Sequence, residues 1–441
     1  MSWTGDHQGL ALSDQRRSWT YSQLRDEAAR WAGTLAARGV EAGDRVALLA
    51  RNRGEFIVLL LSCEHLGAIF QPMNWRLSEA ELDWQIADST PRVVLRDADL
   101  DEGPGDAAIR GDERAETEPW MLLYTSGTTG KPKGALITHG QVRANAAVTL
   151  GACELTAEDS TLTFTPLFHT GGLNCLTTPL LRVGGHVVLR PSLEDALDVI
   201  RDEGITLLTG VPTIYQFLSE RPGFSEAMGS VRDALCGGAP LSLTLLQTYL
   251  ELGIPLRQGF GLTEVGPNCF STPPQRVREK LGTVGRLVPG LEARLVDGEL
   301  QLRGPMVFGG YWGHPPHEGW FHTGDVLQVD DEGFWSVTGR KKEMFISGGE
   351  NVYPAEVEAA LYACGGIAQC AVIGVEDERW GEVGRAFVEP SPGATLSPEA
   401  LHGALQGRLA RYKQPKRIEV LASLPRTPSG KIDKQRLGEM P

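Results

Sequence analysis

The residues best suited to chemistry lie in the stretch YTSGTTGKPKG, residues 124–134. Glycines let backbone amides approach a ligand closely, hydroxyls add donors, and lysines add positive charge, which together describe a phosphate-binding loop. It is not a nucleotide P-loop of the form G-x-x-x-x-G-K-[ST], because Lys131 is followed by Pro132 and then by the strand-like GALITH. We therefore expect a phosphate loop between two strands, with a glycine-rich surface turn as the alternative.

Alternating helices and strands must hold this loop. Residues 18–39 carry apolar side chains at helical spacing and end at Gly39, which predicts an amphipathic helix. Such alternation along the chain indicates a layered α/β domain with a largely parallel sheet. The pattern continues with a buried strand at 44–50, a buried helix at 55–67, a helix at 81–89 and a strand at 92–97, and it recurs at 184–191, 195–220 and 231–241.

Composition narrows the class of protein. The chain has 441 residues, 41% hydrophobic and 22% charged, as in ordinary globular proteins. A net charge of -14 argues against nucleic-acid binding, which needs a basic surface. Seven scattered cysteines without metal-ligand spacing favour a reducing cytoplasm. No signal peptide or transmembrane segment is expected, because the most apolar segment, 56–70, contains Glu64 and His65 and is short for a span.

The pattern of expected secondary structure changes twice along the sequence. After about residue 280 it becomes strand and turn, and from Arg340 helices and strands mix again over about 100 residues. We therefore predict an α/β fold with a large multi-layer N-terminal domain, 1–339, made of two α/β subdomains plus a β-rich subdomain at about 280–339. A small α+β C-terminal domain, 343–441, follows it.

Four further segments follow the loop in order: GFGLTE at 259–264, WFHTGD at 320–325, GRKKEMFISGGENVYPAEVE at 339–358 and LPRTPSGKIDKQRL at 424–437. With the loop, this series closely resembles the adenylate-forming superfamily of acyl-CoA synthetases, peptide-synthetase adenylation domains and beetle luciferases, and among these the acyl-CoA ligases most. The resemblance covers nearly the whole chain. Five motifs in family order make chance an unsatisfactory explanation.

The resemblance implies a two-step reaction. ATP and a carboxylate give an acyl-adenylate and pyrophosphate, and a thiol, usually coenzyme A, then displaces AMP to form a thioester. Attack of a carboxylate on the α-phosphorus brings two anions together, so the site must neutralise charge with Mg²⁺, lysine and backbone donors. The second step needs mainly positioning.

Carried over residue by residue, the resemblance implies an ATP- and AMP-binding site. The loop would hold the β- and γ-phosphates, Phe260 would stack on adenine, Thr263 would bind the α-phosphate, and Asp325 would bind the ribose hydroxyls. A carboxylate offers the acceptor pair that two vicinal hydroxyls need. The full set is Thr125, Ser126, Gly127, Thr128, Thr129, Gly130, Lys131, Gly237, Gly238, Ala239, Pro240, Phe260, Gly261, Thr263, Asp325, Arg340 and Lys431.

Three residues carry the implied chemistry. Glu264 matches the Mg²⁺ carboxylate, as a hard cation beside phosphates prefers an oxygen ligand. Lys431 matches the lysine that bridges the reacting carboxylate and the α-phosphate, and His169 falls where many acyl-CoA synthetases have a histidine near the carboxylate. Taken singly, Glu264 could be a turn acid, Lys431 a solvated lysine and His169 a structural histidine.

The implied thiol site lies in the C-terminal domain. Gly348, Gly349 and Glu350 match the segment that lines the pantetheine tunnel, where glycine permits close approach. The basic segment RLARYKQPKR, 408–417, either receives coenzyme A phosphates or forms a solvated helix face. The resemblance places both Lys431 and Gly349 at the entrance of the active site, which they cannot occupy at the same time. The C-terminal domain must therefore be mobile, with residues 340–342 as hinge and Lys342 as pivot.

The acid is expected to be a monocarboxylic fatty or aromatic acid, because the segments expected to form the acyl pocket are apolar and lack arginine and lysine. An o-succinylbenzoate-CoA ligase, and a module that loads a carrier protein, remain alternatives. A nucleotide-binding protein without catalysis is a third alternative, which the intact Lys431, Glu264 and loop disfavour. A homodimer is left open.

Overall fold

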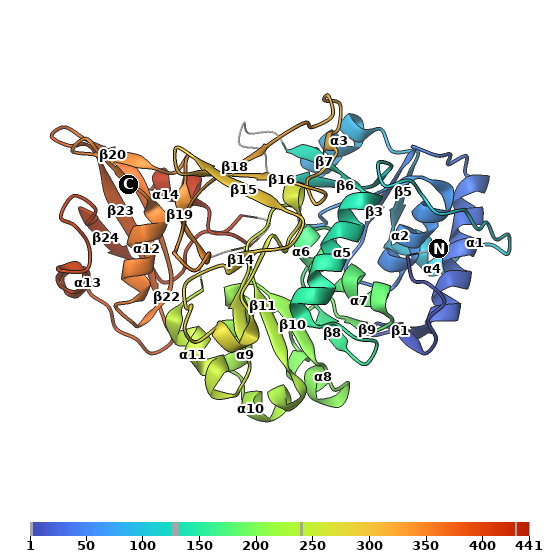
Figure 1. Ribbon diagram of the computed structural model, residues 1–441, viewed down its shortest axis with the longest axis horizontal. Helices are drawn as coiled ribbons and strands as arrows, with labels where there is room; N and C mark the ends of the chain where they lie inside the picture. The colour runs from blue at the N-terminus through green and yellow to red at the C-terminus, as the bar shows by residue number, and fades with distance from the viewer. Residues whose placement is uncertain (1–2, 126–131, 239–240, 428–429, 441) are drawn as a thin grey trace.

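The computed structural model describes residues 3–125, 132–238, 241–427 and 430–440. Two large sheets with their helices form the body of the molecule, and a smaller antiparallel sheet lies beside them. The elements after Arg340, orange and red in Figure 1, gather at the end of the molecule opposite the blue N-terminal helices. The multi-layer α/β fold is as predicted.

The first sheet has six strands in the order β17-β7-β6-β4-β3-β5. β3, β4, β5 and β6 run parallel, whereas β7 is antiparallel to both β6 and β17. The strands are β3 (Arg45–Leu49), β4 (Ile69–Pro72), β5 (Val93–Arg96), β6 (Pro119–Thr125), β7 (Lys133–Thr138) and β17 (Gly310–Tyr311).

Five helices accompany this sheet: α1 (Tyr21–Ala37), α2 (Glu55–Leu66), α3 (Glu79–Ser89), α4 (Asp97–Glu102) and α5 (His139–Cys153). α2 is buried along nearly its whole length between α1 and the sheet, which explains its unbroken apolar composition. Among the described helices, none combines the length and the apolarity that crossing a bilayer requires.

The second sheet has seven strands in the order β12-β11-β10-β8-β9-β1-β2, all parallel except the β1–β2 pair. Its strands are β1 (Leu10–Ser13), β2 (Ser18–Thr20), β8 (Ser160–Thr163), β9 (His186–Leu189), β10 (Leu207–Gly210), β11 (Asp233–Cys236) and β12 (Leu256–Gln258). Its helices are α6 (Thr170–Asn174), α7 (Thr177–Val183), α8 (Ala196–Asp202), α9 (Pro212–Ser219), α10 (Phe224–Ala227) and α11 (Leu243–Glu251).

The β-rich part contains a four-stranded antiparallel sheet, β15 (Glu292–Val296), β16 (Glu299–Arg303), β18 (Phe321–Val329) and β19 (Trp335–Arg340), and the short pair β13 (Phe270–Ser271) and β14 (Arg286–Leu287). The part of the chain that the structure describes also contains short 3₁₀ helices, η1 (Met228–Ser230), η2 (Thr263–Val265) and η3 (Pro274–Arg276).

The C-terminal part has its own sheet and its own buried core. The strands are β20 (Phe345–Ser347), β21 (Glu350–Val352), β22 (Ile367–Asp377), β23 (Gly381–Pro390) and β24 (Arg417–Val420), and the helices are α12 (Pro354–Tyr362), α13 (Pro398–Leu405) and α14 (Lys434–Gly438). α12 packs against β19, the last strand of the neighbouring sheet.

Two local expectations need correction. The helix predicted at 18–39 begins at Tyr21, because Ser18–Thr20 pair with β1 and Thr20 caps the helix through a reciprocal bond with Gln23. The basic segment 408–417 is not a helix face, since α13 ends at Leu405 and Gly407 adopts φ +79°. The predicted domain limits at 339 and 343 remain predictions.

Candidate active site

Glu264 lies where three segments meet. It is 9% exposed, at the first turn after β12, in η2. Its Oε1 accepts hydrogen bonds from the Tyr311 hydroxyl at 2.8 Å and, over a longer distance of 3.4 Å, from the Thr125 hydroxyl. Burial, followed by the negative charge of Glu264, raises the pKa of Tyr311 well above its ordinary value, so this hydroxyl stays a donor.

The predicted phosphate loop connects two paired strands, as expected. β6 and β7 are antiparallel, with Thr125 opposite Lys133 and Tyr124 opposite Gly134. Since Thr125 contacts Glu264, the base of the loop lies beside the proposed metal carboxylate. The nominated residues Ser126, Gly127, Thr128, Thr129, Gly130 and Lys131 lie outside the described residues.

Asp325, the predicted ribose-binding residue, is a buried carboxylate. It is 2% exposed on β18, opposite Arg340 of β19, whose Nε lies 2.9 Å from Asp325 Oδ1. Oδ2 is buried and has no hydrogen-bond partner among the described residues. A buried acceptor without a donor is unfavourable, and a ribose hydroxyl would supply that donor. Burial raises the pKa of Asp325, and the charges of Arg340 and Lys431 oppose that rise.

Lys431 reaches the same site from the C-terminal part. Its carbonyl accepts a hydrogen bond from Thr427 N at 2.8 Å. The residue as a whole remains exposed, but loss of hydration around its ammonium group, followed by the charge of Arg340, lowers its pKa. The negative charges of Asp325 and Glu264 act in the opposite direction, so both predicted carboxylates lie near enough to influence this lysine.

His169 precedes α6 with its ring 4.5 Å from that of Phe168, and its Nε2 is buried without a partner among the described residues. Loss of hydration, then the positive charges of Lys431 and Arg76, lower the pKa of His169 to about 4. The imidazole is therefore neutral at neutral pH and free to bond a substrate oxygen. Sequence reasoning missed Arg76, because a single arginine in the loop after β4 carries no motif.

The proposed adenine-binding residues lie at the carboxyl ends of β10, β11 and β12, where open α/β sheets bind ligands. Gly237 N donates to Gly210 O, and a Cβ on Gly261 would lie 2.3 Å from Gly266 O, so that position excludes a side chain. Phe260 is half-buried, with its ring 5.7 Å from that of Phe270. Of the remaining nominated residues, Gly238 has φ +79°, Thr263 begins η2, and Ala239 and Pro240 lie outside the described residues.

Gly348 and Gly349 form the two-residue turn between β20 and β21, with φ +62° and +87°, and Glu350 begins β21. Both positive values favour glycine in such a hairpin. The turn is exposed, and Gly348 adjoins Trp380, whose carbonyl accepts its N–H at 2.9 Å. The Arg379 guanidinium lies 5.0 Å from the Trp380 ring, so an exposed aromatic face with positive charge borders the turn.

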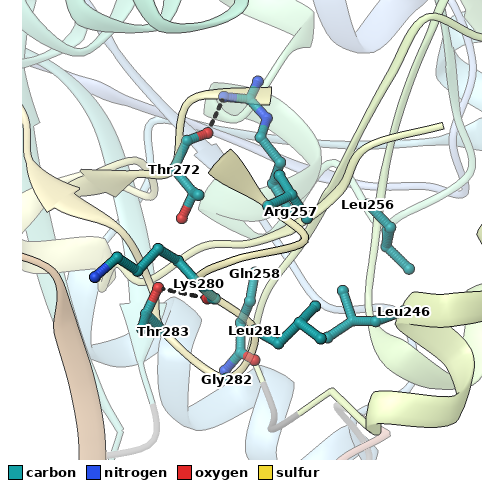
Figure 2. Close-up of a pocket in the computed structure, with 10 residues that line it drawn as sticks. Leu246, Leu256, Arg257, Gln258, Thr272, Lys280, Leu281, Gly282 and Thr283 are labelled. Carbon is teal, nitrogen blue, oxygen red and sulfur yellow. Dashed lines mark hydrogen bonds between the residues drawn. The ribbon is translucent and has the colours of Figure 1, made fainter. Parts of the chain in front are cut away.

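A separate crevice is lined by residues of α11, of β12 and of the segment before β14 (Figure 2). Arg257 projects into it from β12 and donates to Thr272 O at 3.1 Å, and its guanidinium also pairs with buried Asp233. None of the described residues nominated for the site lines it. We assign no ligand to this crevice, because its arginine is already satisfied.

The residues fit Mg²⁺ only together with a polyphosphate. Among the described residues no cluster of three or more His, Cys, Asp or Glu side chains could hold a metal ion. Mg²⁺ commonly uses one or two carboxylates plus substrate phosphates, which matches a single buried Glu264 beside a phosphate loop.

The sequence has known relatives throughout its length. A feruloyl-CoA synthase from Amycolatopsis sp is 40% identical over 97% of this chain and 93% of that protein. An indoleacetate–CoA ligase from Aromatoleum aromaticum is 38% identical over 99% of this chain and 97% of that protein.

Solved structures are also similar to this protein over nearly the whole chain. ATP-bound MatB from Rhodopseudomonas palustris superimposes with a TM-score of 0.91 at 30% identity, covering 99% of this chain and 96% of that one, and apo MatB gives 0.83 at the same identity and coverage. O-succinylbenzoate coenzyme A synthetase from Bacillus subtilis, in complex with ATP and magnesium ion, gives 0.87 at 31% identity, with 99% of both chains covered.

The profile of the AMP-binding enzyme family matches residues 3–312, and that of the AMP-binding enzyme C-terminal domain matches residues 356–431. The first match includes Thr125, Thr263 and Glu264, and the second ends at Lys431. The chain therefore belongs to the AMP-binding enzyme family.

Proposed function

We propose that this protein is an ATP-dependent acyl-CoA ligase that activates an aromatic monocarboxylic acid as its acyl-adenylate and transfers the acyl group to coenzyme A. The observation that carries the proposal is the contact of buried Glu264 with Thr125 at the base of the phosphate loop, together with the unpartnered buried oxygen of Asp325 and the nearby charge of Lys431. This arrangement joins a cation to the residues that would bind ATP, as the first half-reaction requires.

In that half-reaction each residue has a separate task. Asp325 Oδ2 would accept a hydrogen bond from the ribose, with Arg340 holding the other carboxylate oxygen. Thr263 and the loop after Thr125 would bind phosphate oxygens. Mg²⁺ held by Glu264 would neutralise phosphate charge. Lys431 would then bridge the acid and the α-phosphate, which brings the two anions into reacting distance.

Two observations support an aromatic acid. The relatives named above are, by name, a feruloyl-CoA synthase and an indoleacetate–CoA ligase. The segments expected to surround the acyl group include α6 and α7, which are buried at 172–174 and 177–181, and α9, which buries Pro212, Tyr215 and Leu218. Neutral His169 would bond the reacting carboxylate, with Arg76 nearby as a cation. The o-succinylbenzoate activity remains the second candidate, favoured by the structural match to that synthetase.

The thiol step requires a different arrangement of the C-terminal part. The Gly348–Gly349 turn and Trp380 are exposed here, whereas Lys431 faces the nucleotide residues. The higher TM-score against ATP-bound than against apo MatB also supports an adenylation-like arrangement. The exposed turn, the aromatic face of Trp380 and the charge of Arg379 would receive coenzyme A after a rotation.

We place the pivot of that rotation at Lys342. On one side, Lys341 Nζ lies 3.2 Å from Glu299 of β16, and Lys341 N donates to Gly324 O. On the other side, Glu343 pairs at 2.5 Å with Lys434 of α14. The side chains of the two neighbours of Lys342 thus pair with opposite parts of the molecule, while the backbone N–H groups of Glu343 and Met344 donate to Arg340 O. We therefore place the change in φ and ψ at the residue between the two side-chain pairs.

The cytoplasm is the proposed location, because all seven cysteines are unpaired thiols. A homodimer is also proposed, and sedimentation equilibrium would test it.

A pyrophosphate-release assay tests the function. We expect ATP- and Mg²⁺-dependent pyrophosphate release with hydroxycinnamic or indole acids, and a coenzyme A thioester only when coenzyme A is added. Faster turnover of fatty acids would refute the aromatic assignment, and preference for an aromatic dicarboxylate would favour the second candidate. Acylation of a carrier protein in place of coenzyme A would refute the assigned thiol.

A further inference from the structure

Glu264 is held from two sides by one short segment. Its backbone carbonyl accepts a hydrogen bond from Phe308 N at 2.7 Å, and its side-chain Oε1 accepts one from the Tyr311 hydroxyl at 2.8 Å. The Thr125 hydroxyl, at 3.4 Å, is the weaker of the two side-chain donors. Tyr311 is therefore the principal group that sets the orientation of this carboxylate.

Tyr311 is itself fixed by the first sheet. It lies in β17, opposite Ala135 of β7, and the next residue, Trp312, donates its N–H to Gly134 O at 2.7 Å. The ring of Phe308 packs edge-on against the Tyr311 ring with centroids 4.8 Å apart. These contacts restrict the hydroxyl to the direction of Glu264, because neither backbone nor ring can turn away without losing them.

The bond pattern leaves one carboxylate oxygen available. Both hydroxyls bind Oε1, and Oε2 accepts no hydrogen bond among the described residues. A carboxylate that binds a metal through one oxygen is commonly oriented by a hydrogen bond to the other. Lys133 Nζ lies 5.2 Å from the centre of the Tyr311 ring, so the same ring borders the base of the phosphate loop.

We propose that Tyr311 is a positioning residue that holds Glu264 with Oε2 directed at a divalent cation bound together with the phosphates of ATP. The inference rests on the proposed function, since it presumes that Glu264 binds the metal of a metal–ATP complex. Tyr311 would touch neither the cation nor the nucleotide and would act only through the carboxylate.

The test measures binding instead of turnover. ATP affinity is determined by calorimetry in excess MgCl₂ and again in EDTA, for the wild type and for Tyr311→Phe, which keeps the ring and removes the hydroxyl. Loss of a hydrogen bond to a charged group should weaken binding in MgCl₂ by roughly tenfold. Affinity in EDTA should stay within about twofold, because Tyr311 does not touch the nucleotide.

Tyr249→Phe is the matched control, because it also removes one buried hydroxyl, which donates to Tyr215 O at 2.9 Å away from the site. It should leave both affinities unchanged. In a Glu264→Gln background, Tyr311→Phe should add little further loss, as expected for groups that act as a unit. Mn²⁺–ATP resonance spectra should change for Tyr311→Phe and not for Tyr249→Phe.

Wild-type affinity of Tyr311→Phe in MgCl₂ would overturn the inference. An equal loss with and without metal would also overturn it, because the hydroxyl would then be merely structural. If the wild type binds ATP equally well in EDTA and MgCl₂, the metal–ATP premise of the proposed function fails instead. The two failures are therefore distinguishable.

Discussion

The nucleotide side and the lysine side of the site are built in different ways. Glu264 and Asp325 are nearly inaccessible to solvent and are held by partners on neighbouring strands. Lys431 and the Gly348–Gly349 turn, both in the C-terminal part, are instead exposed. The side of the site that only binds ATP can be rigid. A part that serves two half-reactions in succession must instead be able to move away from the ATP-binding residues after the first. Substitutions on the two sides should therefore affect different steps.

The largest effect is expected from Lys431→Ala. Removing a charge aimed at the transition state should slow acyl-adenylate formation by about 100-fold or more. Thioester formation from supplied acyl-AMP should stay largely intact, because we assign the lysine to the first step only. Single-turnover measurements of the two half-reactions separate these effects. A mutant that forms acyl-AMP at a nearly normal rate would remove Lys431 from the site.

Lys342→Pro should affect the opposite half-reaction. Proline fixes φ and should trap the adenylation arrangement, so acyl-AMP synthesis continues while thioester formation falls by roughly tenfold or more. Gly349→Leu should cause the same loss by blocking the approach of the thiol.

Limited proteolysis near residue 342 distinguishes these two variants. The cleavage pattern should respond to ligands in Gly349→Leu and not in Lys342→Pro. Full coenzyme A thioester turnover by Lys342→Pro would place the pivot elsewhere.

Glu264→Ala should weaken the dependence on metal without unfolding the protein. Loss of one carboxylate ligand should raise the Mg²⁺ concentration for half-maximal activity by roughly tenfold. A magnesium titration at saturating ATP, with a thermal melt as the folding control, measures this shift. An unchanged titration curve would contradict the assignment of Glu264.

The smallest effect concerns pH. The pKa of His169 is lowered from 6.5 to about 4, so between these values the unfolded chain binds a proton that the folded chain does not. His169 thus lowers stability as pH falls through this window. In His169→Asn the loss of stability from pH 7 to 4.5 should be shallower, as measured by urea denaturation. Parallel curves for mutant and wild type would refute the lowered pKa.

The fold class and the order of the motifs could be predicted from the sequence, because both depend on local patterns. The alternation of apolar strands and helices predicts the parallel sheets, and strand composition on both sides of the phosphate loop predicts the β6–β7 pair. Identification of Glu264 and Lys431 depends on five motifs in series, since each residue alone has an ordinary structural explanation.

Three neighbours of the site could not be predicted. Tyr311, Arg76 and Trp380 lie in segments without chemical signature, and their places depend on which strands pair and how the chain folds back. The ends of short helices and strands could not be predicted from the sequence either. Pairing of Ser18–Thr20 with β1, for example, depends on a partner strand that local helical spacing does not reveal.

The two ion pairs beside Lys342 also bear on how freely the protein changes state. Lys341–Glu299 lies on one side of the proposed pivot and Glu343–Lys434 on the other, so the proposed rotation about Lys342 would separate neither pair. The electrostatic contacts that such a rotation would break are those of Lys431 with Asp325 and Glu264. Salt, which screens exposed charges, should therefore affect the rotation mainly through Lys431 and hardly through the two ion pairs beside Lys342.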